Sequence, residues 1–148
     1  MRQNVNKVEL IKFQKDDSLF IQKNFPSYFR DNSTENIERI ICSWQDALCF
    51  CVTYNGAKVG IISLGEKEGG KLSWGVMIKE EYRGRGIAWS AFNLIEKKAK
   101  EKGYSTIISS CAAENIASKK LHQKCGFNCI KEEVNAAGNK MLRWEKEI

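Results

Sequence analysis

The fold of this chain is decided by the stretch Arg83-Gly84-Arg85-Gly86-Ile87-Ala88, which follows an apolar run from Leu72 to Ile78 and opens an amphipathic helix. The two glycines let the backbone approach a ligand closely, because no Cβ stands in the way. The first turn of a helix also offers unpaired N–H groups and the positive end of the helix dipole. A strand, a glycine-rich turn and a helix in this order predict an anion site. A plain connection between strand and helix is the alternative interpretation.

Two familiar phosphate-binding classes are excluded by the residues that follow. The third glycine of a dinucleotide fingerprint would fall on Trp89, and no Gly-Lys-Ser or Gly-Lys-Thr of a Walker loop is present. The site is therefore expected to use main chain and arginine in another arrangement.

Length and composition predict a single soluble domain over residues 1–148. Hydrophobic residues make up 43% of the chain and charged residues 28%, which is ordinary for a globular protein. No apolar run approaches the ~20 residues of a membrane span, and the N-terminal residues lead into a strand pattern without a signal peptide. We therefore expect a cytoplasmic protein that does not bind membranes.

The cysteines predict reduced, buried thiols rather than a metal site. Six cysteines occur without any C-x-x-C pair, and His122 is the only histidine. Without such spacing a structural zinc site is not expected, so we expect no metal.

Net charge is concentrated in the half of the chain that carries the glycine turn. The chain carries +6 in all, of which residues 1–74 contribute +1 and residues 75–148 contribute +5. This distribution suits an anionic ligand. It also suits a weak nucleic-acid surface, but no nucleic-acid motif supports that interpretation, and no nucleic-acid partner is expected.

Periodicity predicts an α/β fold, more closely a mixed α+β sheet. Expected strands are 8–13, 47–54, 59–64, 72–78, 104–110, 129–134 and 140–144. Expected helices are a short one around 19–25, then 34–44, 87–102 and 115–124. The helix 87–102 joins two strands as a crossover, which predicts one parallel pair within an otherwise antiparallel sheet. A crevice is expected where these two strands diverge, beside the glycine turn.

The helix at 115–124 carries a second group of polar residues. Asn115, Ser118, Lys119 and His122 share one face by helical spacing. A separate apolar stripe is expected to dock on the sheet; it consists of Ala117, Leu121 and Cys125. The polar face predicts a lined site; a solvated surface helix with an incidental histidine is the alternative.

Together these motifs resemble the GCN5-related N-acetyltransferase (GNAT) family. The first is Tyr82-Arg83-Gly84-Arg85-Gly86-Ile87-Ala88, and the second is Asn115-x-x-Ser118-x-x-Leu121-His122-x-Lys124-x-Gly126-Phe127. The resemblance implies a GNAT-like fold with a mostly antiparallel sheet, one parallel pair splayed at the acetyl-CoA site and about four helices. It implies acetyl-CoA as the co-substrate.

The resemblance also implies roles for individual residues. The backbone amides of Arg85 to Ala88 would cradle the coenzyme A pyrophosphate, helped by the start of the motif at Arg83. The strand before the turn would bulge and pair with the pantetheine arm, and the N–H of Ile78 would stabilise the oxyanion. The implied coenzyme-binding set is Val76, Met77, Ile78, Arg83, Gly84, Arg85, Gly86, Ile87, Ala88, Asn115, Ser118, Lys119 and His122. The outer phosphate of coenzyme A has three candidate partners, among which the sequence does not choose: Lys119, Lys120 and Lys124.

His122 departs from the family pattern, which has tyrosine at this position as the acid that protonates the leaving thiolate. Histidine can donate a proton as imidazolium or from its neutral N–H. Two roles are open: His122 is the general acid, or it packs or contacts the coenzyme. The general base is unassigned, with Glu66, Glu68, Glu114 and a water chain as candidates.

The function that the resemblance implies is direct transfer of an acetyl group from acetyl-CoA to a primary amine of a small molecule or peptide. Aromatic residues of the first two helices (Phe20, Phe25, Tyr28, Phe29 and Trp44) lie in the expected acceptor region, which has no acidic run to suit a polycation. The alternative is a non-catalytic acyl-CoA-binding or sensing domain of the same fold. Monomer and homodimer are both open.

Overall fold

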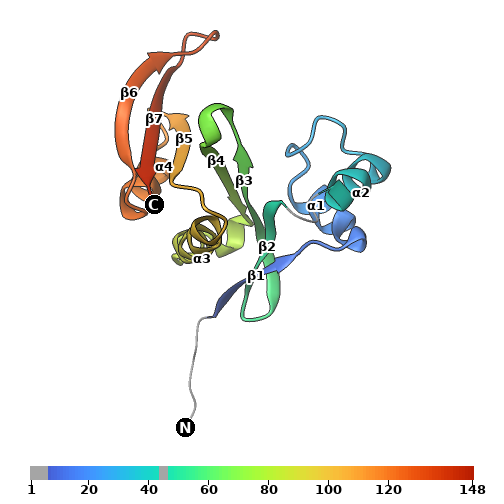
Figure 1. Cartoon of the computed structure of the whole chain (residues 1–148). Helices are drawn as coiled ribbons and strands as arrows, with labels where there is room; N and C mark the ends of the chain where they lie inside the picture. The colour runs from blue at the N-terminus through green and yellow to red at the C-terminus, as the bar shows by residue number, and fades with distance from the viewer. Residues whose placement is uncertain (1–6, 44–46) are drawn as a thin grey trace.

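The computed structural model describes residues 7–43 and 47–148. Within them, one sheet has seven strands in the order β1-β2-β3-β4-β5-β7-β6 (Figure 1). The strands are β1 (Val8–Lys12), β2 (Leu48–Tyr54), β3 (Ala57–Glu66), β4 (Leu72–Ile78), β5 (Thr106–Ala112), β6 (Asn128–Val134) and β7 (Lys140–Glu147). The helices are α1 (Ser18–Asn24), α2 (Thr34–Ser43), α3 (Ile87–Glu101) and α4 (Ile116–Lys124). Trp44, expected at the end of the second helix, lies outside the described residues.

The sheet is mixed, as the sequence predicts. β1 to β4 form an antiparallel meander, β5 pairs with β7 and β7 with β6 in antiparallel fashion, and β4 and β5 are the parallel pair. The crossover through α3 explains that pair, since a parallel neighbour needs a long connection. The expected fold class, a GNAT-like mixed sheet with four helices, is confirmed.

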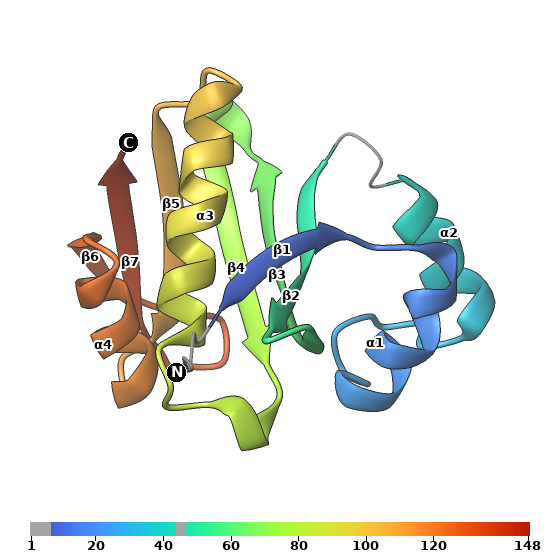
Figure 2. The ribbon, with the colours of Figure 1, turned by 90° about the horizontal axis from the view of Figure 1, so that it is seen from below.

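Helices cover both faces of the sheet, in different halves. α3 lies along the centre of one face with α4 beside it, whereas α1 and α2 lie on the opposite side near β2 and β3 (Figures 1 and 2). The larger core joins α3 to the sheet and includes Phe92 and Ile95, both fully buried. A smaller core joins α1 and α2 to β2 and β3, with Ile21 and Ile37 at its centre.

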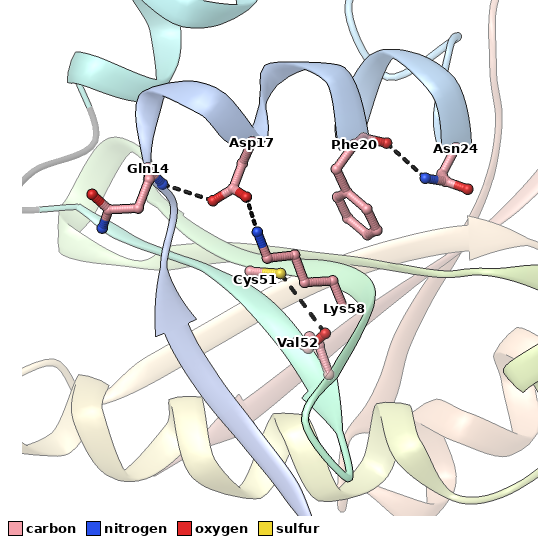
Figure 3. A network of polar contacts seen from close by, with 7 residues as sticks. All are labelled: Gln14, Asp17, Phe20, Asn24, Cys51, Val52 and Lys58. Carbon is pink, nitrogen blue, oxygen red and sulfur yellow. Dashed lines mark hydrogen bonds and ion pairs between the residues drawn. The ribbon is translucent and has the colours of Figure 1, made fainter.

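A buried carboxylate fastens α1 to the sheet. Asp17 ends the 3-10 turn η1 (Lys15–Asp17) and is only 2% exposed. Its carboxylate accepts from the backbone N–H of Gln14 at 2.8 Å and from the ammonium of Lys58 on β3, as Figure 3 shows. Burying a charge is tolerated only when it is paired and hydrogen-bonded, and here both conditions hold.

Two 3-10 turns flank β4, namely η2 (Glu68–Gly70) and η3 (Glu80–Tyr82). No helix in the described part of the chain is both long enough and apolar enough to cross a membrane.

Candidate active site

β4 and β5 are paired at only one end, and this opens a gap in the sheet. The parallel register comprises Leu72 with Ile107 and Ser73 with Ile108, and it does not continue beyond Ser73. β4 continues to Ile78 and stays paired with β3, so its last residues face the gap on the β5 side only. The crevice expected at the glycine turn lies here.

The end of β4 directs main-chain groups into this gap. The N–H of Lys79 donates to the carbonyl of Val59 on β3 at 2.8 Å. Since successive residues of an antiparallel strand point their N–H and C=O groups to opposite sides, Met77 faces β3 while Val76 and Ile78 face the gap. The carbonyl of Ile78 confirms this direction, because it accepts from Nε of Arg83 at 2.9 Å.

The expected bulge in this strand is not found in its pairing with β3. The register runs without a shift from Gly60 opposite Ile78 to Glu66 opposite Leu72. The prediction of a bulge there is wrong, because the gap arises from the divergence of β5 and needs no extra residue in β4.

The glycine turn brings backbone to the mouth of the gap. Gly84 and Gly86 have φ of +78° and +79°, the left-handed region that side chains disfavour. A Cβ built on either glycine meets no atom within 4 Å, so the side that glycine leaves bare is open space. Gly86 is the N-cap of α3, and the N–H groups of the first turn after it have no intrahelical acceptor.

The two arginines of the motif have different environments. Arg83 lines the gap, and its side chain folds back onto Ile78. Arg85 turns away: its guanidinium lies 5.1 Å from the ring centroid of Tyr82 and donates to the carbonyl of Glu81. In this arrangement the Arg85 side chain is exposed and lines neither of the two cavities described below.

Two adjoining cavities, of about 320 Å³ and 410 Å³, form a continuous groove along β4, the turn and α4. Five residues line both cavities: Ile78, Arg83, Ala88, Ala117 and Leu121. The groove also includes Val76, Met77, Gly84, Gly86, Ile87, Asn115 and Ser118 from the predicted set. The glycine turn and α4, which are separate motifs in the sequence, thus face each other across one site.

Asn115 begins α4 and still offers a donor to the groove. Its Oδ1 accepts from the N–H of Ser118 at 3.0 Å, which is an N-cap. The cap uses only the oxygen of the side-chain amide, so the NH2 group of Asn115 takes no part in it.

The structure distinguishes among the three lysines of α4. Lys120 and Lys124 line the groove near the glycine turn, and Lys119 lines neither cavity. The ammonium of Lys124 lies 4.7 Å from the ring centroid of Trp89. Trp89 and Tyr82 also line the groove and were not predicted to do so; Trp89 lies one residue beyond the predicted loop.

His122 is in the core, and both ring nitrogens have partners. It is 3% exposed and is absent from the groove lining. Nδ1 lies 2.7 Å from the carbonyl of Ser118, which can only accept, so the proton is on Nδ1. Nε2 then accepts from the hydroxyl of Ser109 at 2.7 Å, and Nε1 of Trp74 lies 3.4 Å away. Burial lowers the pKa of His122 below its usual range, opposed by the bond to Ser118.

The faces of α4 differ in part from the expectation. His122 is buried toward the sheet, because partners from β4 and β5 satisfy its imidazole. Of the predicted apolar stripe, Cys125 is buried in the core and Leu121 packs against it, whereas Ala117 is exposed in the groove lining. The prediction of a docked stripe is thus right for Cys125 and Leu121 and wrong for Ala117.

No cysteine lines the groove. Burial raises the pKa of Cys49, Cys51 and Cys125 to about 12, so these thiols are not nucleophiles at neutral pH. Of the candidate bases, Glu66 and Glu114 do not line the groove, and the side chain of Glu68 lies outside the described part. In residues 7–43 and 47–148, no group of three or more potential metal ligands lies together.

Comparison with known proteins identifies the class. The sequence matches the acetyltransferase (GNAT) family over residues 18–127. The chain belongs to this family of acetyl-CoA-dependent N-acetyltransferases, and the resemblance inferred from the two motifs is confirmed. No curated protein matches the sequence significantly.

Solved structures share the fold over nearly their whole length. An N-acetyltransferase from Staphylococcus aureus Mu50 has a TM-score of 0.79 at 20% identity, over 95% of this chain and 98% of that chain. An acetyltransferase from Salmonella typhimurium, solved with its cofactor acetyl-CoA, has a TM-score of 0.77 at 16% identity, over 96% and 94%. A variant of the spermidine N-acetyltransferase SpeG from Vibrio cholerae has a TM-score of 0.79 at 18% identity, over 95% and 93%.

Proposed function

We propose that residues 1–148 form one N-acetyltransferase domain that moves an acetyl group from acetyl-CoA directly to a primary amine of a small molecule or peptide. One observation carries the proposal. The groove combines a left-handed glycine turn at the start of α3 with main-chain groups of Val76 and Ile78 that face away from β3 and have no strand partner. The Salmonella typhimurium relative was solved with acetyl-CoA, and the Vibrio cholerae relative is a spermidine N-acetyltransferase. Both are consistent with this assignment.

The groove suits the three parts of coenzyme A in sequence. The backbone of Gly84 to Ala88 would hold the pyrophosphate through N–H groups and the helix dipole. Val76 and Ile78 would pair with the pantetheine arm as a sheet edge pairs with a peptide, and the Asn115 NH2 group would donate to it. Lys120 and Lys124 are the lysines positioned for the outer phosphate, with Trp89 beside them.

Acetyl-CoA supplies an activated acetyl thioester. The acceptor amine, after losing one proton to solvent, bonds through nitrogen to the acetyl carbon; the carbon–sulfur bond breaks, and the proton leaving the nitrogen ends on the sulfur. The N–H of Ile78 would donate to the acetyl oxygen as negative charge develops on it. In other acyl transfers, one such donor lowers the activation free energy by about 3 kcal/mol. Direct transfer is supported by the absence of cysteines from the groove lining.

The contacts of His122 support the packing role over the acid role. The imidazole is buried, its Nδ1–H is donated to Ser118, and its Nε2 lacks a proton to give. We propose that His122 positions α4 against β5, while the sulfur is protonated by another donor such as water.

Coenzyme binding and turnover separate the enzyme from a binding domain. Acetyl-CoA should raise the melting temperature, and free thiol should appear when amines are added. Stabilisation without thiol release from any primary amine would favour the acyl-CoA-binding alternative. No stabilisation at millimolar acetyl-CoA would contradict both. His122→Gln should keep kcat within about threefold, since a catalytic acid typically contributes 100-fold or more.

A further inference from the structure

A third cavity, separate from the groove, lies on the other side of the β4–β5 contact from α3. It has a volume of about 430 Å³ and is lined by Lys67, Ser73, Ile108, Ser109, Ser110 and Arg143. Ser73 alternates with Leu72 and Trp74, which are buried against α3, so its side chain is on the opposite face of the sheet. β4 borders both this cavity and the groove. We call this one the distal cavity.

The lining of the distal cavity is cationic and rich in hydroxyl groups. Among the described side chains, its lining has two charged residues, Lys67 and Arg143, and no carboxylate. Two carboxylates lie beside the cavity: Glu133 is 2.9 Å from Arg143 and 3.5 Å from Lys131, and Glu145, opposite Ile108 in the β5–β7 register, is 2.9 Å from Lys71. These four cations and two carboxylates sum to +2, so the cavity attracts anions and repels cations.

Arg143 is available for exchange with a ligand. The side chains of Arg143 and Glu133 are 45% and 33% exposed, and solvent-exposed ion pairs are weak. An anionic oxygen group that enters the cavity can therefore take the place of Glu133. The guanidinium then donates two parallel hydrogen bonds to it, a geometry that suits carboxylate and phosphate. Ser110 lies directly opposite Arg143 in the β5–β7 register and adds a hydroxyl donor.

The cavity lies at a useful distance from the reacting end of the groove. Ser73 and Ile78, whose N–H is proposed to hold the acetyl oxygen, are five residues apart on one strand, which corresponds to roughly 16 Å at ~3.3 Å per residue. The long side chains of Arg143 and Lys67 shorten the span that a ligand must bridge. A short peptide, or a small molecule of similar length, can thus place an anion in the distal cavity and an amine at the gap.

We propose that the amine acceptor carries a second, anionic oxygen group, carboxylate or phosphate, which Arg143 and Lys67 bind in the distal cavity. This inference rests on the proposed acetyl transfer and names its substrate class. A polyamine would place an ammonium against Lys67 and Arg143, so spermidine is expected to be a poor acceptor here.

A panel of primary amines tests the inference by thiol release. Carboxylated amines (glycylglycine, triglycine), a phosphorylated amine (O-phosphoethanolamine), a neutral amine (ethanolamine) and spermidine are compared at equal concentration. Whichever of the carboxylated and phosphorylated amines has the higher kcat/KM identifies the anion that the cavity binds. At least one should show kcat/KM about tenfold or more above ethanolamine and spermidine, the effect of one charge-assisted contact.

Charge removal locates the contact. Arg143→Gln and Lys67→Gln should each raise KM for the preferred acceptor about fivefold to tenfold, with KM for acetyl-CoA unchanged. Lys97→Gln, an exposed charge on α3, is the matched control and should change neither constant. Calorimetric binding of glycylglycine and O-phosphoethanolamine to the coenzyme A complex provides a readout independent of turnover.

Two results would overturn the inference while leaving acetyl transfer intact: equal or better kcat/KM for neutral amines or spermidine, and unchanged KM in both Gln variants. Absence of thiol release from every amine contradicts the proposed function instead. In that case calorimetry still decides whether the distal cavity binds the anionic probes, and no binding would overturn the inference as well.

Discussion

The imidazole of His122 stacks on the indole of Trp144, with ring centroids 5.0 Å apart and 17° between the ring planes. Trp74 and Phe127 approach the same imidazole edge-on at 5.6 Å and 5.3 Å. The only histidine of the chain is thus buried among aromatic rings, and its removal from water makes protonation unfavourable.

This environment predicts a stability loss on acidification. Burial lowers the pKa of His122 in the folded state, so below about pH 6.5 the unfolded chain takes up the proton first. The contribution is fully present above that pH and is lost as pH falls, by at most about 1.4 kcal/mol per pH unit. Denaturant unfolding at pH 7 and pH 5 should show a larger loss for the wild type than for His122→Gln. Parallel pH dependence in the two proteins would contradict the assignment.

Gly86→Ala should weaken coenzyme binding more than it weakens the fold. The new methyl group points into the open side of the turn, and a left-handed alanine costs about 1–2 kcal/mol. Gly138→Ala is the matched control, because Gly138 has φ of +84° and nothing within 4 Å but lies in the β6–β7 turn. We expect the two variants to have similar melting temperatures. Only Gly86→Ala should bind coenzyme A more weakly than the wild type, by at least about tenfold. Equal affinity of the two variants would argue against the cradle.

Lys120→Gln and Lys124→Gln should lower the affinity for coenzyme A more than that for 3′-dephospho-coenzyme A. The expected loss is about threefold to tenfold at low salt, and it should shrink as added salt screens the charges. Lys119→Gln provides the comparison on the same helix, since Lys119 does not line the groove. A larger effect at Lys119 would move the outer phosphate to the other face of α4.

Lys58→Met should destabilise the protein by about 1–3 kcal/mol, because the buried Asp17 carboxylate loses its charged partner. Asp17→Asn in the same chain should recover part of this loss, since no buried charge is then left unpaired. Urea unfolding of the two single variants and the double variant measures the coupling. Additive losses would show that the pair is energetically independent.

The strands, the crossover and the glycine turn were predictable because their signals are local. The apolar run Leu72 to Ile78 is a strand over the same residues, and Asn55-Gly56 turns between β2 and β3 with positive φ at both positions. Strand ends were less well placed: β7 extends to Glu147, three residues beyond the expected end, because pairing with β5 continues there.

Features that depend on distant partners were missed. The inward face of α4 is set by Ser109 and Trp74, which no helical pattern around His122 reveals. Lys58 and Asp17 are 41 residues apart in the sequence and meet only in the folded chain. The distal cavity likewise joins the β3–β4 connection to β7. The cytoplasmic location and the oligomeric state stay predictions.

The divergence of β4 and β5 after Ser73 also bears on solubility. An outer strand with unpaired N–H and C=O groups invites pairing with other chains, and proteins usually shield such edges. At Val76 and Ile78 the groups without a strand partner lie inside the sheet, between two blocks of strands and beside α4. Protein on both sides of this interior edge hinders the approach of a strand from another chain. An interior edge therefore carries less risk of aggregation than an outer edge would.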